Sequence, residues 1–160
     1  MPKAVVLVES ASAPSDEVRE LIAELDAELG GNYAPEQQHG LTLDAIFAPG
    51  MRFFVARIDG DAVGCGGVAL FEDFAEVKRM YVRPSARGHG IADTIIARIE
   101  AEARAAGLRV LRLETGDEQR AAMRFYERSG FTECAAFEPY ASMNPYAIAT
   151  SVFMEKTLAD

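Results

Sequence analysis

Apolar residues recur every three or four positions in three long segments of the chain, which predicts three amphipathic helices. They cover residues 16–30, 90–106 and 118–129. Ser15 or Asp16 is suited to cap the first helix. Glycines that favour helix ends follow the three apolar faces, at Gly30–Gly31, Gly107 and Gly130. A fourth, shorter helix is predicted over residues 41–47, after a polar loop over residues 35–40.

Between these helices, alternating or continuous apolar runs predict strands. The predicted strands are residues 4–8, 52–58, 62–71, 76–82, 110–114, 131–136 and 151–156. Asp59-Gly60-Asp61 is typical of a hairpin turn between the second and third strands. Residues 137–150 are predicted to form a long loop. Strands that alternate with helices predict an α/β or α+β fold built on one sheet. Because the sequence contains no linker or internal repeat, we expect one domain over residues 1–160.

The glycines of residues 64–67 and the two cysteines are interpreted as structural, not as functional sites. Gly64-Cys65-Gly66-Gly67 lies inside a strand pattern, where a bulge or close packing explains glycines better than a phosphate loop does. Cys65 and Cys134 form no CxxC pair and accompany no histidine cluster, so no metal site is predicted. They are interpreted as thiols in a reducing compartment.

Charge and length restrict the class of partner. The formal net charge is −9, which argues against nucleic acid or an anionic membrane and favours a small-molecule enzyme with a cationic acceptor. The amino-terminal apolar run is too short for a signal peptide. No segment approaches the roughly 20 apolar residues of a membrane span. We therefore expect a cytoplasmic protein.

The segment with the most candidate functional residues is 76–92, EVKRMYVRPSARGHGIA. This segment holds Lys78, Arg79, Arg83 and Arg87 and, after Glu76, no acidic residue. It ends in a glycine turn that runs directly into a predicted helix. A helix start presents unpaired backbone N–H groups, and glycines let an anion approach them closely. The segment predicts a site for a pyrophosphate.

Three phosphate-binding designs are candidates for this segment. A P-loop requires G-x-x-x-x-G-K-[ST], which the sequence lacks. A Rossmann turn requires a third glycine where Asp93 stands, so a nucleotide-binding oxidoreductase is a weak alternative. The third design fits: R-x-x-G-x-A, formed by Arg87, Gly90 and Ala92, resembles the acyl-CoA-binding signature Q/R-x-x-G-x-G/A of the GNAT N-acetyltransferases.

A second motif supports the same resemblance. Ala122, Phe125, Tyr126, Gly130 and Phe131 follow the A-x-x-F-Y-E-x-x-G-F run of the GNAT family, although Gln119 stands where many members carry Asn. The similarity covers residues 51–131, and residues 151–156 resemble the last strand of the family. It implies a GNAT fold, with a mixed, splayed central sheet of about six to seven strands flanked by about four helices.

The resemblance implies transfer of an acetyl group from acetyl-CoA to a primary amine, directly in a ternary complex. An alkylammonium of pKa about 10 must first lose a proton, which costs roughly 4 kcal/mol at pH 7. Glu76 matches the family position that often holds the base, with Glu114 or a water relay as alternatives. Tyr126 occupies the position of the acid that protonates the departing CoA thiolate.

The cofactor contacts are assigned by the same resemblance. The backbone of Met80, Tyr81 and Val82 would pair with the pantetheine arm. The pyrophosphate would be held by residues Arg87, Gly88, His89, Gly90, Ile91 and Ala92. Phe125, next to the proposed acid, is assigned to the cofactor site as well.

Several alternatives stay open at this point. A non-catalytic protein that senses acyl-CoA would have the same pyrophosphate site. The acceptor amine, whether a small molecule or a peptide, and the length of the acyl chain are not defined by the motifs. An edge strand near the carboxyl end could pair in a homodimer.

Overall fold

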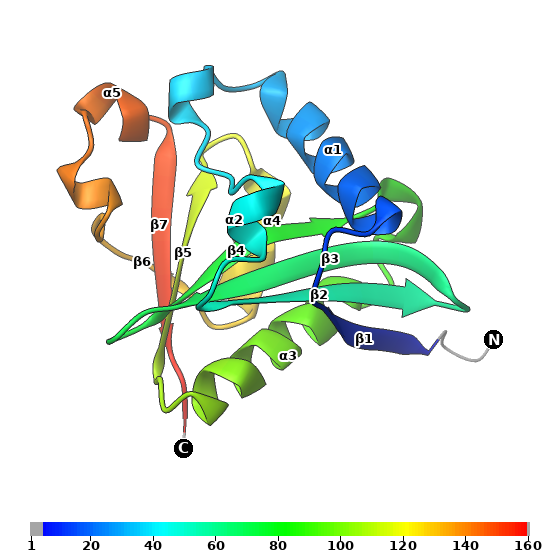
Figure 1. Ribbon diagram of the computed structural model, residues 1–160. Coiled ribbons are helices and arrows are strands. Elements are labelled where there is room, and N and C mark those ends of the chain that lie inside the picture. Colours follow the sequence, from blue (N-terminus) through cyan, green and yellow to red (C-terminus); the bar gives the residue numbers. More distant parts are fainter. Residues whose placement is uncertain (1–4, 160) are drawn as a thin grey trace.

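The computed structural model describes residues 5–159, and its centre is a seven-stranded sheet in the order β1-β2-β3-β4-β5-β7-β6 (Figure 1). The strands are β1 Val6–Ala11, β2 Met51–Ile58, β3 Asp61–Leu70, β4 Ala75–Val82, β5 Val110–Gly116, β6 Thr132–Glu133 and β7 Ser151–Thr157. Neighbouring strands run antiparallel except β4 and β5, which are parallel. The sheet is therefore mixed, as the GNAT resemblance implied.

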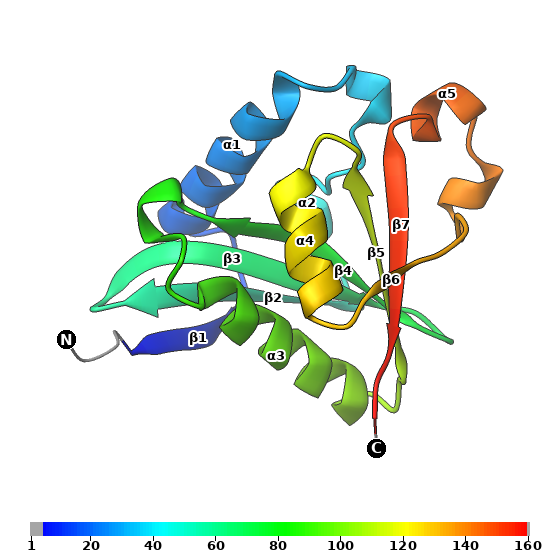
Figure 2. The same ribbon diagram turned by 180° about the vertical axis from the view of Figure 1, so that it is seen from behind.

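Helices cover both faces of this sheet. They are α1 Asp16–Gly30, α2 Leu43–Ile46, α3 Ile91–Ala105, α4 Arg120–Arg128 and α5 Pro145–Ile148. Helices α1 and α2 pack on one face, and α3 and α4 pack on the other (Figures 1 and 2). Ser15 caps α1 by accepting a hydrogen bond from the Val18 amide at 3.2 Å, as its sequence predicted. None of the helices within residues 5–159 is long and apolar enough to cross a membrane.

The contact between β4 and β5 is short. Only two residue pairs join them, Ala75 with Leu111 and Glu76 with Arg112. Beyond Glu76 the two strands separate (Figure 1). The same part of β4 carries a bulge, where Arg79 adopts a φ of 53° and the register with β3 shifts. The sheet is therefore open between its two central strands.

The glycines of β3 allow this arrangement. A Cβ at Gly66 would lie 2.5 Å from Met80 Sδ and 2.7 Å from Ile95 Cγ2, so only glycine fits between the bulged β4 and α3. Gly60 and Asp59 have φ values of 86° and 51°, as a tight hairpin turn requires. The predictions of a hairpin turn at residues 59–61 and of a bulge or close packing at residues 64–67 are confirmed.

The carboxyl-terminal third differs from the prediction. The strand predicted over residues 131–136 is wrong in length, because only Thr132 and Glu133 pair with β7 before Phe137 turns inward. The segment 137–150 is not simply a loop. It contains a 3₁₀ turn at Tyr140–Ser142 and helix α5, which Asn144 caps by accepting from the Tyr146 amide at 2.8 Å. The strand predicted over residues 4–8 begins at Val6, and Ala4 lies outside the described residues.

Candidate active site

A groove of about 550 Å³ opens beside the glycine turn, and Leu25 and Glu28 of α1 contribute to its lining. One wall is the end of β4 with the glycine turn before α3, and the other is α4. Nine of the ten residues assigned to the cofactor line it: Met80, Tyr81, Val82, Arg87, Gly88, Gly90, Ile91, Ala92 and Phe125. The tenth, His89, is exposed and is not among the lining residues.

The glycine turn in this groove fits a pyrophosphate. Gly88 and Gly90 have φ values of 86° and 75°, which side-chain-bearing residues rarely adopt. Gly90 is the N-cap of α3 and offers no capping side chain, so the first amides of the helix lack the usual acceptor. A Cβ at Gly88 would meet nothing within 4 Å, so the turn borders open space. Unpaired amides at an open helix start are a suitable place for a phosphate.

The arginines of the basic segment are less available than the sequence indicated. Arg83 pairs with Glu24 at 3.0 Å, Arg87 pairs with Glu28 at 3.0 Å, and Arg79 pairs with Asp26. These carboxylates all belong to α1, so much of the positive charge holds α1 against β4. The pair of Arg87 and Glu28 is half exposed, and such pairs contribute only about 0–1 kcal/mol. Arg87 can therefore exchange this partner at low cost.

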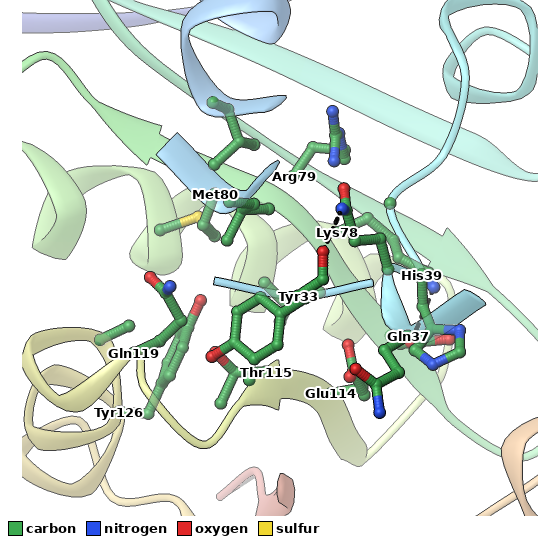
Figure 3. Close-up of a pocket in the computed structure, with 18 of the residues that line it drawn as sticks. Tyr33, Gln37, His39, Lys78, Arg79, Met80, Glu114, Thr115, Gln119 and Tyr126 are labelled. Carbon is green, nitrogen blue, oxygen red and sulfur yellow. Dashed lines mark hydrogen bonds and ion pairs between the residues drawn. The ribbon is translucent and has the colours of Figure 1, made fainter. Parts of the chain in front are cut away.

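A second, smaller pocket of about 130 Å³ lies in the opening between β4 and β5 (Figure 3). Its polar lining includes Glu76, Lys78 and Arg79 from β4, and Glu114 from β5. The two cavities share five lining residues: Leu25, Met80, Gln119, Ala122 and Tyr126. The pocket and the groove therefore meet, and Tyr126 borders both.

Glu76 lines this pocket and is held by two donors. Its carboxylate is almost fully buried and accepts a hydrogen bond from the Tyr140 hydroxyl at 2.5 Å. The same oxygen is 2.9 Å from Lys78 Nζ, which also donates to the Tyr140 oxygen at 2.6 Å. Burial and the neighbouring Glu76 carboxylate raise the pKa of Tyr140, so its hydroxyl keeps its proton. The three groups form a closed network.

Glu114 is the second carboxylate of the pocket. It accepts a hydrogen bond from the Ser151 hydroxyl at 2.6 Å. Burial is the main cause that raises the pKa of Glu114 above its ordinary value, and the negative charge of Glu76 adds to the effect. The Ser151 hydrogen bond and the nearby His39 and Lys78 oppose this rise. Glu114 is therefore a stronger base than an exposed glutamate.

Tyr126, on α4, lines the pocket (Figure 3) and also lines the groove. Its ring packs against Phe125 and Phe131. Burial alone raises the pKa of Tyr126, so the hydroxyl is protonated at neutral pH. The structure thus brings both predicted catalytic groups, Glu76 and Tyr126, to the same pocket.

Sequence reasoning did not assign Tyr33 or His39, which also line the pocket. Tyr33 accepts a hydrogen bond from the Glu118 amide at 2.8 Å and lies across Gly116, where a Cβ would be 2.1 Å from its hydroxyl. His39 packs edge-on against the ring of Tyr140. Neither residue belongs to a periodic or glycine-rich pattern. Tyr140 could be noticed in the sequence as an aromatic residue of the segment 137–150.

The mixed sheet opens at its one parallel pair of strands, and there a groove suited to phosphate meets a pocket lined by carboxylates. These features together indicate a group-transfer enzyme of the acetyltransferase class. The family model "Acetyltransferase (GNAT) family" matches residues 17–131. An IAA acetyltransferase from Azospirillum brasilense is 44% identical over 160 residues, which cover 99% of this chain and 100% of that protein. The chain belongs to the GNAT acetyltransferase family.

Solved structures agree with this assignment. A Klebsiella pneumoniae protein assigned as an acyl-CoA N-acyltransferase is 34% identical, with a TM-score of 0.76 over 97% of this chain and 99% of that one. A GNAT acetyltransferase from Elizabethkingia anophelis with acetyl-CoA bound has a TM-score of 0.68, covering 96% of this chain and 98% of that one. Its identity of 15% means that it supports the fold alone.

Proposed function

We propose that this chain transfers the acetyl group of acetyl-CoA to the primary amine of an acceptor, directly and within a ternary complex. The observation that carries the proposal is the meeting of the two cavities at Met80 and Tyr126. A donor along the groove would present its thioester at the point where the pocket opens. The thioester supplies an acyl carbon for the amine nitrogen and a thiol as leaving group.

The amine needs a proton acceptor, and two carboxylates compete for that role. Both hydrogen-bond donors of Glu76 contact one oxygen, so this carboxylate is already engaged with Tyr140 and Lys78. Glu114 has a raised pKa and a single hydrogen-bonded hydroxyl, Ser151. These contacts favour Glu114 as the group that takes the proton, with Glu76 holding Lys78 and Tyr140 in place. The prediction that Glu76 is the base stays a prediction, and the two assignments are separable by mutation.

Tyr126 is proposed to protonate the departing sulfur. Its pKa is raised by burial, which makes the phenol a weaker acid than in water. A thiolate at the same place would be desolvated by the same surroundings, so its proton affinity would rise too. The difference between the two groups then stays small enough for a proton to pass from oxygen to sulfur as the carbon–sulfur bond breaks.

Direct transfer is favoured over a covalent acyl-enzyme. Cys65 is fully buried against Arg79, and burial raises its thiol pKa to about 12. Such a thiol is not a nucleophile at neutral pH. Cys134 packs against the cluster of Phe137, Tyr140 and Phe153 and does not itself line the groove or the pocket.

The proposed function is tested by titrating the protein with acetyl-CoA in a calorimeter, with NADH in parallel. Binding of acetyl-CoA alone supports the donor, and binding of NADH alone would support the oxidoreductase. Thiol release is then measured with primary amines and with IAA, since one relative is called an IAA acetyltransferase. Binding without release to any acceptor would favour the sensor.

A further inference from the structure

Helix α4 carries three arginines at intervals of four residues, Arg120, Arg124 and Arg128. Residues four apart on a helix lie on one face, about 6 Å apart along the axis. All three are exposed, and all three line the cofactor groove. They form a row on the wall opposite the glycine turn. We call these three residues the α4 arginine row.

No carboxylate within residues 5–159 forms an ion pair with this row. Arg128 lies over the ring of Phe125, with its guanidinium carbon 6.0 Å from the ring centre. Six other arginines within residues 5–159 do pair with acidic side chains: Arg57, Arg79, Arg83, Arg87, Arg98 and Arg112. Like charges four residues apart repel each other and destabilise a helix. In a chain of formal net charge −9, such a row indicates an external anion.

The groove already has a place for one anion. The amides at the start of α3 suit a pyrophosphate, and this turn faces the row across the groove. Glu28, Asp93 and Glu118 also line the groove, so negative ligand groups are favoured only near the amides and near the row. A ligand that fits both places carries two separate phosphate groups. CoA is such a ligand, because its ribose bears a 3′-phosphate apart from the pyrophosphate.

We infer that the α4 arginine row binds the 3′-phosphate of CoA. The inference rests on the proposed function, since it requires CoA in the groove. Guanidinium groups bind phosphate through paired N–H donors, and three of them let the phosphate engage at least two. The row then sets the enzyme's preference for CoA over thioesters and nucleotides that lack this phosphate.

The test compares CoA with 3′-dephospho-CoA, which lacks only the phosphate in question. Calorimetry would give both dissociation constants for the wild type, for Arg124→Ala and for the triple variant Arg120→Ala/Arg124→Ala/Arg128→Ala. A charge-assisted contact corresponds to about 10-fold to 100-fold in affinity. The wild type is expected to prefer CoA by at least about tenfold, and the triple variant to bind both ligands alike. Its affinity for dephospho-CoA should match that of the wild type, which also reports that it folds.

Arg19→Ala is the matched control, since it removes the same charge from an exposed position on α1 that does not line the groove. It should keep the wild-type preference. Equal binding of both ligands by the wild type would overturn the inference and leave the donor assignment intact. Equal weakening of both ligands in the triple variant would also overturn it. If the wild type binds neither ligand, the proposed function itself fails.

Discussion

The hydroxyl of Tyr140 donates a 2.5 Å hydrogen bond to the carboxylate of Glu76, across 64 positions of the sequence. This contact joins the 3₁₀ turn before α5 to the strand that forms one wall of the opening in the sheet. Lys78 contacts both groups, so the buried negative charge has two donors. The carboxyl-terminal segment thereby completes the pocket that β4 and β5 begin.

Removing this hydroxyl should destabilise the protein. Tyr140→Phe leaves the buried Glu76 carboxylate with Lys78 as its remaining donor, which is expected to cost about 1–3 kcal/mol of unfolding free energy. Urea unfolding of the variant and the wild type measures this difference in unfolding free energy. Tyr146→Phe is the control, because Tyr146 is 55% exposed. Equal stability of the two variants would mean that the network adds nothing to the fold.

Much of the groove proposed for the cofactor was predictable because its residues are close in sequence. Gly88, Gly90 and the apolar face of α3 form one strand–turn–helix unit, and Tyr126 lies in a recognisable helix motif. The ion pairs between α1 and residues 76–92 were not predictable, because the charge of a residue does not identify its partner. The pocket proposed for the acceptor was harder to predict. It combines Glu114, which the resemblance gave as an alternative base, with Tyr33, His39 and Tyr140 from segments that only the folded chain brings together.

The two carboxylates are separable by their pH profiles. Glu114 must be ionised to accept a proton, and its raised pKa places the acidic limb of kcat/KM above the ordinary carboxyl range. Glu114→Gln should lower kcat/KM by about 10²–10⁴-fold and remove that limb. Glu76→Gln should lower activity less and keep the limb. The opposite pattern, with the limb lost in Glu76→Gln alone, would assign the base to Glu76. Thermal unfolding of both variants controls for misfolding.

The raised pKa of Glu114 also predicts a pH-dependent stability. The folded state holds the Glu114 proton more tightly than the unfolded state, so this group contributes most stability below the ordinary carboxyl pKa of about 4.5. That contribution is lost as the pH rises through the pKa of the folded state. Glu114→Gln cannot lose a proton there. Its unfolding free energy relative to the wild type should therefore increase with pH across this window, and a constant difference would contradict the raised pKa.

The glycine turn is tested by adding bulk and negative charge to it. Gly90→Glu should weaken acetyl-CoA binding by at least about 100-fold, because the new carboxylate would compete for the amides of α3. Gly107→Glu is a close control, with a φ of 80° against 75° at Gly90 and open space around its Cβ position. Both variants carry similar backbone strain. If they bind acetyl-CoA equally well, the turn is not the pyrophosphate site.

Tyr126→Phe separates catalysis from binding at the junction of the two cavities. The ring and its packing on Phe125 and Phe131 are kept, so stability should change by less than about 0.5 kcal/mol and acetyl-CoA affinity should stay near that of the wild type. Loss of the proton donor should lower kcat by about 10²–10⁴-fold. The loss should be smallest for thioesters with an acidic leaving thiol, which need less protonation. If the variant turned over as fast as the wild type, or lost activity equally with all thioesters, Tyr126 would not act as the acid, and the sulfur would take its proton from solvent.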